Sequence, residues 1–302
     1  MDRVRKQIGL DGQETILINP AIGVGLLDSG VYRHPDLEGS IMLQEDFVNQ
    51  KKGVYDDFGH GTHVAGILAG TGLLQRGRYK GVAPFVKLYV GKVLNENGQG
   101  ELHILLKGME WLYQNRKAFG LKVVNISVGI IGVRELEEKR PGADRKIQKL
   151  YELCKAFYEE EILIVSAAGN AGPERNSISA LGDCRYVLAV GCHDGSFQIA
   201  NKRMCAEYSG RGPGRTYFRK PDLVAPGTAI MSCSNLGRGY VKKSGTSMSV
   251  PMVSGAAVLA YSKFPEIGIR ELIQKLLYTA IDLGEDWSKQ GWGMLNVKGL
   301  LT

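Results

Sequence analysis

The chain has few cysteines, and their spacing does not suit a covalent or metal-bound framework. There are five, an odd number, and no two of them are separated by only two residues. A disulfide framework and a zinc site are therefore not expected. Reduced thiols are typical of the cytosol, so we expect a cytoplasmic protein.

Long apolar segments are also missing. No run approaches the roughly 18 apolar residues that a membrane-spanning helix needs. No early segment combines a basic start, an apolar run and a small-residue cleavage site, as a signal peptide does. We therefore expect a soluble protein that is not exported and has no membrane partner.

The charge is basic but does not form a nucleic-acid-binding pattern. The 38 basic and 31 acidic residues give a formal net charge of +7. No known nucleic-acid-binding module and no interleaving of basic and aromatic residues accompany it, so we expect a solvated basic surface and no nucleic-acid partner. The 44% of hydrophobic residues fits a globular protein with a sizeable core.

Apolar runs alternate with helical patterns along the chain. The runs lack the polar alternation of half-exposed strands, which favours a parallel sheet covered on both faces. We expect an α/β fold, a three-layer sandwich whose mostly parallel central sheet is flanked by helices on both faces. The expected strands are residues 21–27, 87–93, 122–127, 162–167 and 186–191, and the expected helices are residues 63–74, 101–119, 145–160, 247–264 and 269–279.

No internal repeat or long linker divides the chain. We expect one catalytic domain over residues 1–302. Residues 1–20 form a short N-terminal extension of it, and the polar residues 130–149 form a surface insertion.

Three distant segments each contain one residue type suited to acyl transfer. Asp28 follows an expected buried strand, at the end where open α/β sheets place their ligands, although a turn or cap role is the alternative. His60 and His63 share a glycine-rich turn; we take His63 as the general base because it opens the expected helix, against the alternative of a packed histidine. Ser247 begins another helix, where a simple N-cap is the alternative. The set predicts peptide-bond hydrolysis with Ser247 as nucleophile and Asp28 orienting the base.

Asn170 supplies a fourth group. It follows an expected strand within a run of small residues. Its side-chain N–H and the backbone N–H of Ser247 are suited to form an oxyanion hole. The alternative is an asparagine that serves only a turn.

These segments together resemble one known family. Their order along the chain is similar to that of the subtilisin-like serine proteases, the subtilases. The matching segments are residues 27–30, 34–37, 60–66, 81–84, 125–129, 167–170, 221–227 and 245–251. The resemblance implies a subtilisin-like fold and a serine endopeptidase that works through an acyl-enzyme on Ser247. We expect an intracellular bacterial-type member that lacks a signal peptide and a propeptide.

The resemblance also implies where a peptide or protein substrate binds as an extended strand. Ser127, Val128 and Gly129 would pair with it and line one wall of the pocket for the residue that donates the scissile carbonyl. The opposite wall of that pocket would be formed by Ala167, Ala168 and Gly169. The second edge that pairs with the substrate would be Gly98 and Gly100, and the floor of a more distant apolar subsite would be Leu102 and Leu105. The small wall residues favour a large, hydrophobic side chain in that pocket.

The segment that corresponds to the family's best-known calcium loop, residues 72–80, offers basic side chains where a hard cation needs oxygen ligands. We therefore expect that calcium site to be absent, although Asp36 matches one of its ligands. Structural calcium elsewhere is still possible, and we expect that the chemistry requires no cofactor.

Two other functions stay open at this point. One is a catalytically silent scaffold that binds peptides, and the other is a transpeptidase or macrocyclase that uses the same acyl-enzyme.

Overall fold

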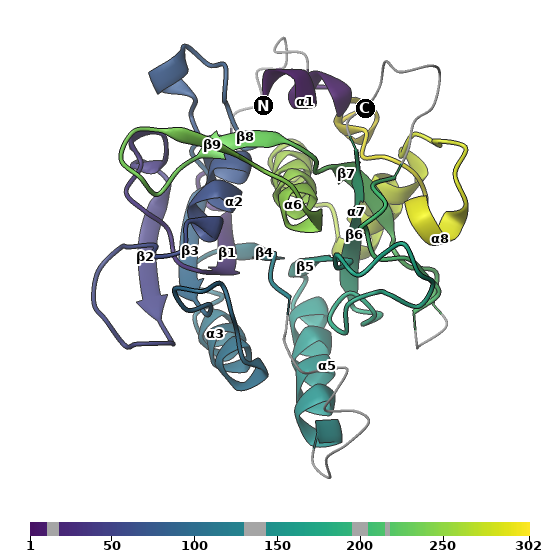
Figure 1. Ribbon diagram of the computed structural model, residues 1–302, viewed down its shortest axis with the longest axis horizontal. Helices are drawn as coiled ribbons and strands as arrows, with labels where there is room; N and C mark the ends of the chain where they lie inside the picture. The colour runs from purple at the N-terminus through teal and green to yellow at the C-terminus, as the bar shows by residue number, and fades with distance from the viewer. Residues whose placement is uncertain (11–17, 130–142, 195–204, 215–217) are drawn as a thin grey trace.

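The computed structural model describes residues 1–10, 18–129, 143–194, 205–214 and 218–302 (Figure 1). Its centre is a seven-stranded sheet in the order β2-β3-β1-β4-β5-β6-β7, and every pairing within that sheet is parallel. The strands are β1 (Gly23–Asp28), β2 (Ile41–Asp46), β3 (Lys87–Lys92), β4 (Leu121–Ile126), β5 (Leu163–Ala167), β6 (Val187–His193) and β7 (Leu223–Pro226). A separate antiparallel pair consists of β8 (Ile230–Cys233) and β9 (Tyr240–Lys243).

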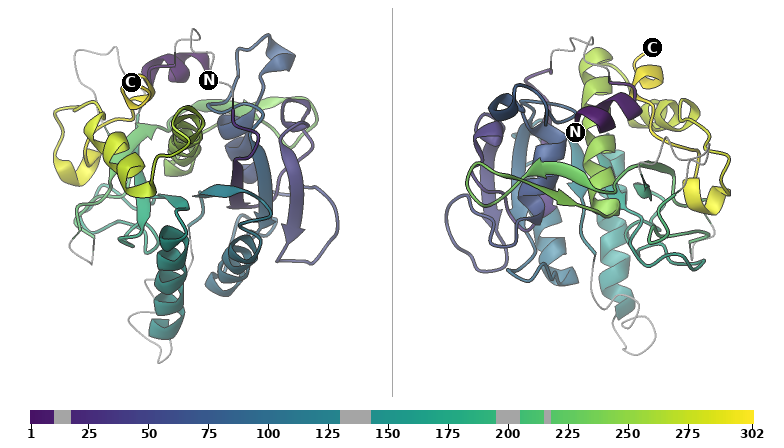
Figure 2. Two further views of the ribbon diagram at one scale, coloured as in Figure 1. Left: turned by 180° about the vertical axis from the view of Figure 1, so that it is seen from behind. Right: turned by 45° about the horizontal axis from the view of Figure 1, so that its top comes forward.

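Helices cover both faces of the sheet, which confirms the three-layer α/β arrangement. Helices α2 (His60–Ala69) and α6 (Thr246–Lys263) lie on one face, and α3 (Leu102–Gln114) and α5 (Ala143–Glu159) lie on the other (Figure 1). In Figure 2, the two chain ends lie near each other, close to α6. The remaining helical segments are α1 (Asp2–Gln7), η1 (Pro35–Leu37), η2 (Leu73–Gln75), α7 (Ile269–Tyr278), α8 (Trp287–Gln290) and α9 (Val297–Leu300).

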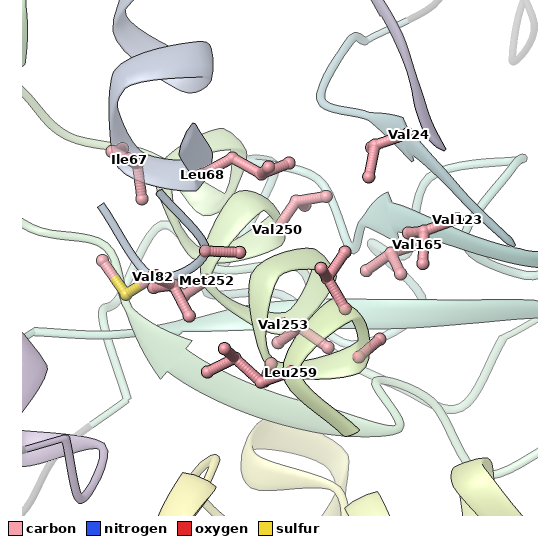
Figure 3. Close-up of a cluster of buried hydrophobic side chains, with 14 of the residues drawn as sticks. Val24, Ile67, Leu68, Val82, Val123, Val165, Val250, Met252, Val253 and Leu259 are labelled. Carbon is pink, nitrogen blue, oxygen red and sulfur yellow. The ribbon is translucent and has the colours of Figure 1, made fainter. Parts of the chain in front are cut away.

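The larger hydrophobic core lies between the sheet and helices α2 and α6 (Figure 3). Strand residues such as Val24 and Val165 face Leu68 of α2 and Val253 of α6 there. Helix α6 is apolar or small around most of its circumference, so it is buried almost completely. Each fully buried Val or Leu side chain contributes about 1.5–3 kcal/mol to folding. This packing fixes the start of α6 near the carboxyl ends of the strands.

The strand order reverses at β1. From β1 the chain continues to β2 and β3 on one side, and β4 then lies on the other side of β1. Ligands of open α/β sheets bind at the carboxyl ends of strands at such a reversal. Asp28 ends β1 there, and Ser127 follows the end of β4.

Two strands of the sheet, β2 and β7, were not among those expected from the sequence. In β2, the residues that face inward include the polar Gln44 and Asp46, while Met42 and Leu43 are more than 40% exposed. Strand β7 is only four residues long and ends in a proline. Both are edge strands, where polar inward residues and prolines are tolerated.

The structure does not test the predicted domain organisation and describes only part of the predicted insertion. Most of the 130–149 insertion lies outside the described residues, and the single-domain organisation stays a prediction. Within the described ranges, no helix has the length and apolar character to cross a membrane.

Candidate active site

Asp28 and His60 form the central pair of the site. The Oδ1 of Asp28 accepts a hydrogen bond from Nδ1 of His60 at 2.7 Å and another from the backbone N–H of Ser29 at 2.8 Å. Asp28 is fully buried, whereas 17% of the His60 side chain remains exposed. The carboxylate is thus fixed in the protein interior, and the imidazole that it orients reaches solvent.

Glycines on both sides of His60 allow this close approach. Gly59, just before α2, has a left-handed backbone with φ of 83°. At Gly61, a Cβ atom would lie 2.0 Å from the carbonyl oxygen of Gly30 and 3.1 Å from Cβ of Asp28. Only glycine fits such a contact, so the first turn of α2 lies directly against the end of β1.

Asp56 connects these two elements. Its Oδ1 accepts hydrogen bonds from the Ser29 hydroxyl at 2.8 Å and from the Gly59 N–H at 2.7 Å, and its Oδ2 accepts from the Thr62 N–H at 2.9 Å. The Ser29 hydroxyl oxygen in turn accepts from the Gly61 N–H at 2.9 Å. Asp56 therefore satisfies free N–H groups at the start of α2 and positions His60. Sequence reasoning missed this residue; its position four residues before a histidine that opens a helix was the available signal.

The prediction that His63 is the general base is wrong. Helix α2 begins at His60, so His63 lies one turn inside it and is fully buried. Its Nε2 lies 3.0 Å from the carbonyl oxygens of both Ile230 and Val241, and its Nδ1 has no partner among the described residues. His63 is a packed histidine that joins α2 to β8 and β9, which was the alternative considered for it.

The two imidazoles have opposite electrostatic environments. Burial, the largest influence, lowers the pKa of His60, but the charge and hydrogen bond of Asp28 oppose it, and the net shift is upward from 6.5. Burial also lowers the pKa of His63, and because no carboxylate compensates, the pKa falls to about 3. His63 therefore stays neutral, while His60 is suited to accept a proton near neutral pH.

Ser247 and Asn170 meet at the start of α6. The Asn170 Oδ1 accepts hydrogen bonds from the backbone N–H and the hydroxyl of Thr246, both at 3.0 Å. A methyl group placed on Gly245 would lie 3.4 Å from Nδ2 of Asn170 and 3.8 Å from the backbone nitrogen of Ser247. The hydroxyl of Ser247 donates to the carbonyl of Ser127 at 2.8 Å. Nδ2 of Asn170 and the backbone nitrogen of Ser247 therefore both lie within 4 Å of one point at Gly245, and the bonds to Thr246 use only the Oδ1 of Asn170.

The residues expected to bind substrate differ in exposure. Gly129 and Gly169 have accessible backbone, as do Gly98 and Gly100 on the loop between β3 and α3. Leu102 and Leu105 are only 4% and 2% exposed and pack into the core beneath α3, so they offer little surface to a ligand. The remaining predicted residues, Ser127, Val128, Ala167 and Ala168, are buried at the ends of β4 and β5. The carbonyls of Ala167 and Ala168 already accept hydrogen bonds from Ser179.

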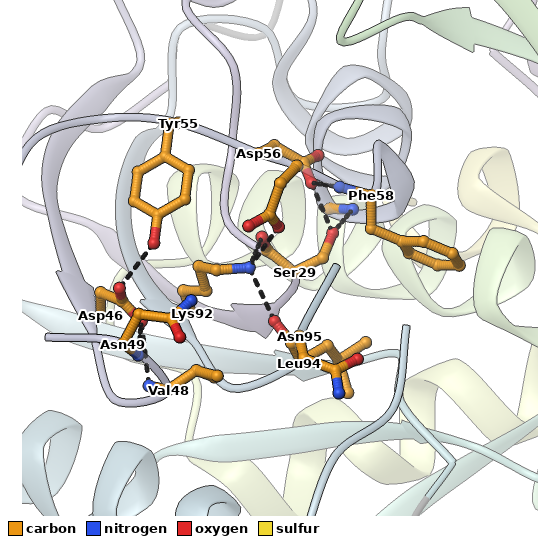
Figure 4. Close-up of polar contacts among 12 residues, drawn as sticks. Ser29, Asp46, Val48, Asn49, Tyr55, Asp56, Phe58, Lys92, Leu94 and Asn95 are labelled. Atoms are coloured by element: carbon orange, nitrogen blue, oxygen red, sulfur yellow. Dashed lines mark hydrogen bonds and ion pairs between the residues drawn. The ribbon is translucent and has the colours of Figure 1, made fainter. Parts of the chain in front are cut away.

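A fully buried lysine supports the same end of the sheet. Nζ of Lys92 donates to the carbonyls of Ser29 and Leu94 at 3.0 and 2.7 Å, and to Oδ1 of Asp57 at 2.6 Å (Figure 4). These bonds hold the segment after β1, the loop after β3 and the turn before His60 together. Sequence reasoning missed Lys92 as well; a lysine within an otherwise apolar strand was its signal.

The carboxylate of Asp36 is already satisfied by protein donors. Oδ1 accepts from the Thr71 hydroxyl and the Leu74 N–H, both at 3.1 Å, and Oδ2 accepts from the Tyr240 hydroxyl at 2.6 Å. His34 and Cys233 lie nearby, with potential ligand atoms of the three side chains within 4.8 Å of one another. The two ring nitrogens of His34 contact the Gly239 carbonyl and the Asp36 N–H. These groups form a hydrogen-bonded cluster and do not present the vacant oxygen atoms that calcium requires.

Comparisons with known proteins identify the family. Residues 19–293 match the family described as Peptidase_S8, the subtilase family. Serine protease AprX of Bacillus subtilis (strain 168) is 33% identical over 309 residues, covering 97% of this chain and 68% of that protein. Subtilisin DY of Bacillus licheniformis is 34% identical over 284 residues, covering 92% and 89% respectively.

Solved structures agree with the sequence relatives. Sphericase is similar with a TM-score of 0.82 and 26% identity, covering 98% of this chain and 97% of that one. The S41 psychrophilic protease is similar with a TM-score of 0.80 and 27% identity. The predicted resemblance and fold are confirmed. The chain belongs to the subtilase family, and it is a subtilisin-like serine endopeptidase.

Proposed function

We propose that Asp28, His60 and Ser247 form the catalytic triad of this protease, with Asn170 and the Ser247 backbone N–H as its oxyanion hole. The observation that carries the proposal is the 2.7 Å contact between buried Asp28 and partly exposed His60. In that contact Nδ1–H of His60 donates to the carboxylate, which leaves Nε2 free to act as the base.

The chemistry follows from these positions. The Ser247 hydroxyl turns from the Ser127 carbonyl toward His60 and attacks the scissile carbonyl carbon, while Nε2 of His60 takes its proton. Asn170 and the Ser247 N–H stabilise the negative oxygen that forms. His60 then gives the proton to the leaving amine as the C–N bond breaks. A water molecule, deprotonated by His60, hydrolyses the acyl-enzyme and regenerates Ser247.

A peptide would bind as an extended strand against residues 127–129 and 98–100. Exposed Gly129 and the accessible Gly100 support this mode, because strand addition depends on free backbone groups. A substrate N–H that bonds to the Ser127 carbonyl replaces the Ser247 hydroxyl there and frees it for attack.

Two further features complete the proposal. The enzyme works without calcium at Asp36, because three protein donors already occupy that carboxylate. It acts in a reducing compartment such as the cytoplasm, which the five free, buried cysteines support.

A serine-reactive fluorophosphonate tests the catalytic proposal. We expect the wild type to gain one phosphonyl group on Ser247, found by peptide mass mapping, and the Ser247→Ala variant to gain none. Incubation with a peptide mixture, with and without an added amine, then separates the possible reactions by product mass. Hydrolysis products alone support the proposal. Absence of labelling would instead support a silent scaffold, and amine adducts would support a transpeptidase.

A further inference from the structure

A half-exposed aromatic ring stands beside the proposed base. Phe58 lies two residues before His60, is 39% exposed and stacks with the imidazole at a centroid distance of 6.3 Å and an interplanar angle of 28°. Its ring also covers Gly98, where a Cβ atom would approach the ring carbons to 2.4 Å. Phe58 thus forms a wall between the loop at Gly98 and His60.

Lys243 extends this wall. It ends β9, four residues before Ser247, and its Nζ lies 5.5 Å from the centroid of the Phe58 ring. A cation over an aromatic face is held by about 0.5–1 kcal/mol at an exposed site. Its charge also acts on the His60 imidazole, in opposition to Asp28.

The charge of Lys243 has no acidic partner among the described residues, whereas buried Lys92 is paired with Asp57. A partly exposed cation beside the reacting groups is therefore available to a ligand. Its neighbour Lys242 lies on the other face of the β8–β9 ribbon. Across this ribbon Lys243 is paired with Ile230, and Lys242 is paired with the next residue, Met231. Successive residues of a strand point to opposite faces, so only Lys243 of this pair shares a face with the wall.

We propose that Lys243, held over Phe58, makes this protease prefer an acidic side chain on the residue that follows the scissile bond. This rests on the proposed function, in which His60 gives its proton to the leaving amine. The residue that carries that amine leaves along the side of Ser247 where His60 stands. We place its side chain beside His60, Phe58 and Lys243, where a carboxylate would meet the Lys243 ammonium.

Three quenched fluorescent peptides test this, identical except for Glu, Gln or Lys directly after the cleaved bond. An exposed ion pair contributes about 0.2–1 kcal/mol, so we expect kcat/KM for Glu to exceed that for Gln about 2- to 5-fold, and that for Lys by about tenfold. The preference should shrink as sodium chloride is raised, because salt screens exposed charges. Product masses verify that all three peptides are cut at the same bond.

Variants identify the cation responsible. Lys243→Met should remove the preference, Lys243→Glu should reverse it, and Lys242→Glu, the matched control on the other face, should retain it. Equal rates on the three peptides with wild type, or the same change with Lys242→Glu as with Lys243→Glu, would overturn the inference and leave the catalytic proposal intact. Failure of wild type to cut any peptide or react with the fluorophosphonate would overturn the proposed function itself.

Discussion

Two histidines three positions apart in the sequence have opposite chemical roles because their surroundings differ. Both are largely removed from water, which disfavours the charged imidazole. At His60 the buried carboxylate of Asp28 more than compensates, whereas at His63 only backbone carbonyls are within reach. The same residue type is therefore suited to act as a base at one position and is a packing residue one turn later.

The pH dependence of catalysis should report on His60. The free base is the active form, so kcat/KM should fall as the pH drops through a pKa above 6.5. The charges that act on His60 are Asp28 and Asp56, which raise its pKa, and Lys243, which lowers it. Asp28→Asn should move the acid limb to lower pH and reduce kcat on the order of 10⁴-fold. An acid limb that does not move in Asp28→Asn would exclude His60 as the titrating base.

The raised pKa of His60 also affects the free energy of unfolding, which decreases as the pH rises, whereas activity increases. The folded-state pKa of His60 is raised, so its contribution to folding is complete below pH 6.5 and is lost as the pH rises through the folded-state pKa.

Asn170 should contribute to turnover and little to binding. In the proposed oxyanion hole, its amide N–H stabilises an oxygen whose negative charge develops in the transition state. Asn170→Ala should therefore lower kcat on the order of 100- to 1000-fold with KM nearly unchanged. Steady-state kinetics, normalised by fluorophosphonate titration of active enzyme, measures this. An increase in KM with kcat preserved would instead indicate a residue that only holds the substrate.

At the scale of elements, the contact between α2 and the β8–β9 ribbon passes through His63. Its pKa of about 3 means that the unfolded chain binds a proton more readily than the folded one. Stability should therefore decrease as the pH falls from about 6.5 toward 3. His63→Gln should be less stable at pH 7.5 but should lose less on acidification than wild type. Urea unfolding at pH 7.5 and 4.5 compares the two, and identical losses in both proteins would contradict this role.

The interiors of the elements could be predicted from the sequence better than their ends. The apolar runs located β1 and β3 to β6, because strands buried on both faces need apolar residues at every position. The start of α2 was placed three residues late. That start is determined by the contact between Gly61 and the Gly30 carbonyl and by the bonds of Asp56, which join residues distant in the sequence. The wrong choice of His63 as base followed directly from this error.

At the scale of the whole molecule, the strand order sets the ends of β1 and β4 side by side, where Asp28 is bonded to His60 and Ser127 to Ser247. That these strand ends share an edge could be anticipated, because the strands are parallel, but the histidine at that edge could not. The Phe58–Lys243 wall could not, since it joins the turn before α2 to the end of β9 only after α2 and α6 have packed together.

Heat stability should not depend on calcium at Asp36. The Asp36 carboxylate already accepts hydrogen bonds from Thr71, Leu74 and Tyr240. EDTA should therefore leave the Tm in scanning calorimetry unchanged, whereas Tyr240→Phe should lower Tm equally with and without EDTA. A Tm that falls with EDTA and recovers with added calcium would show that the metal contributes.

The rate at which a fluorophosphonate modifies Ser247 tests the triad most directly, because it depends on activation of the hydroxyl and not on substrate preference. The rate should be compared for folded wild type, His60→Ala and His63→Gln. Loss of the serine or the histidine of the triad in subtilisin lowers turnover about 10⁶-fold, and we expect a loss of several orders of magnitude for His60→Ala. His63→Gln should react within about tenfold of wild type. Wild-type reactivity in His60→Ala, together with its loss in folded His63→Gln, would contradict the assignment of His60 as the base.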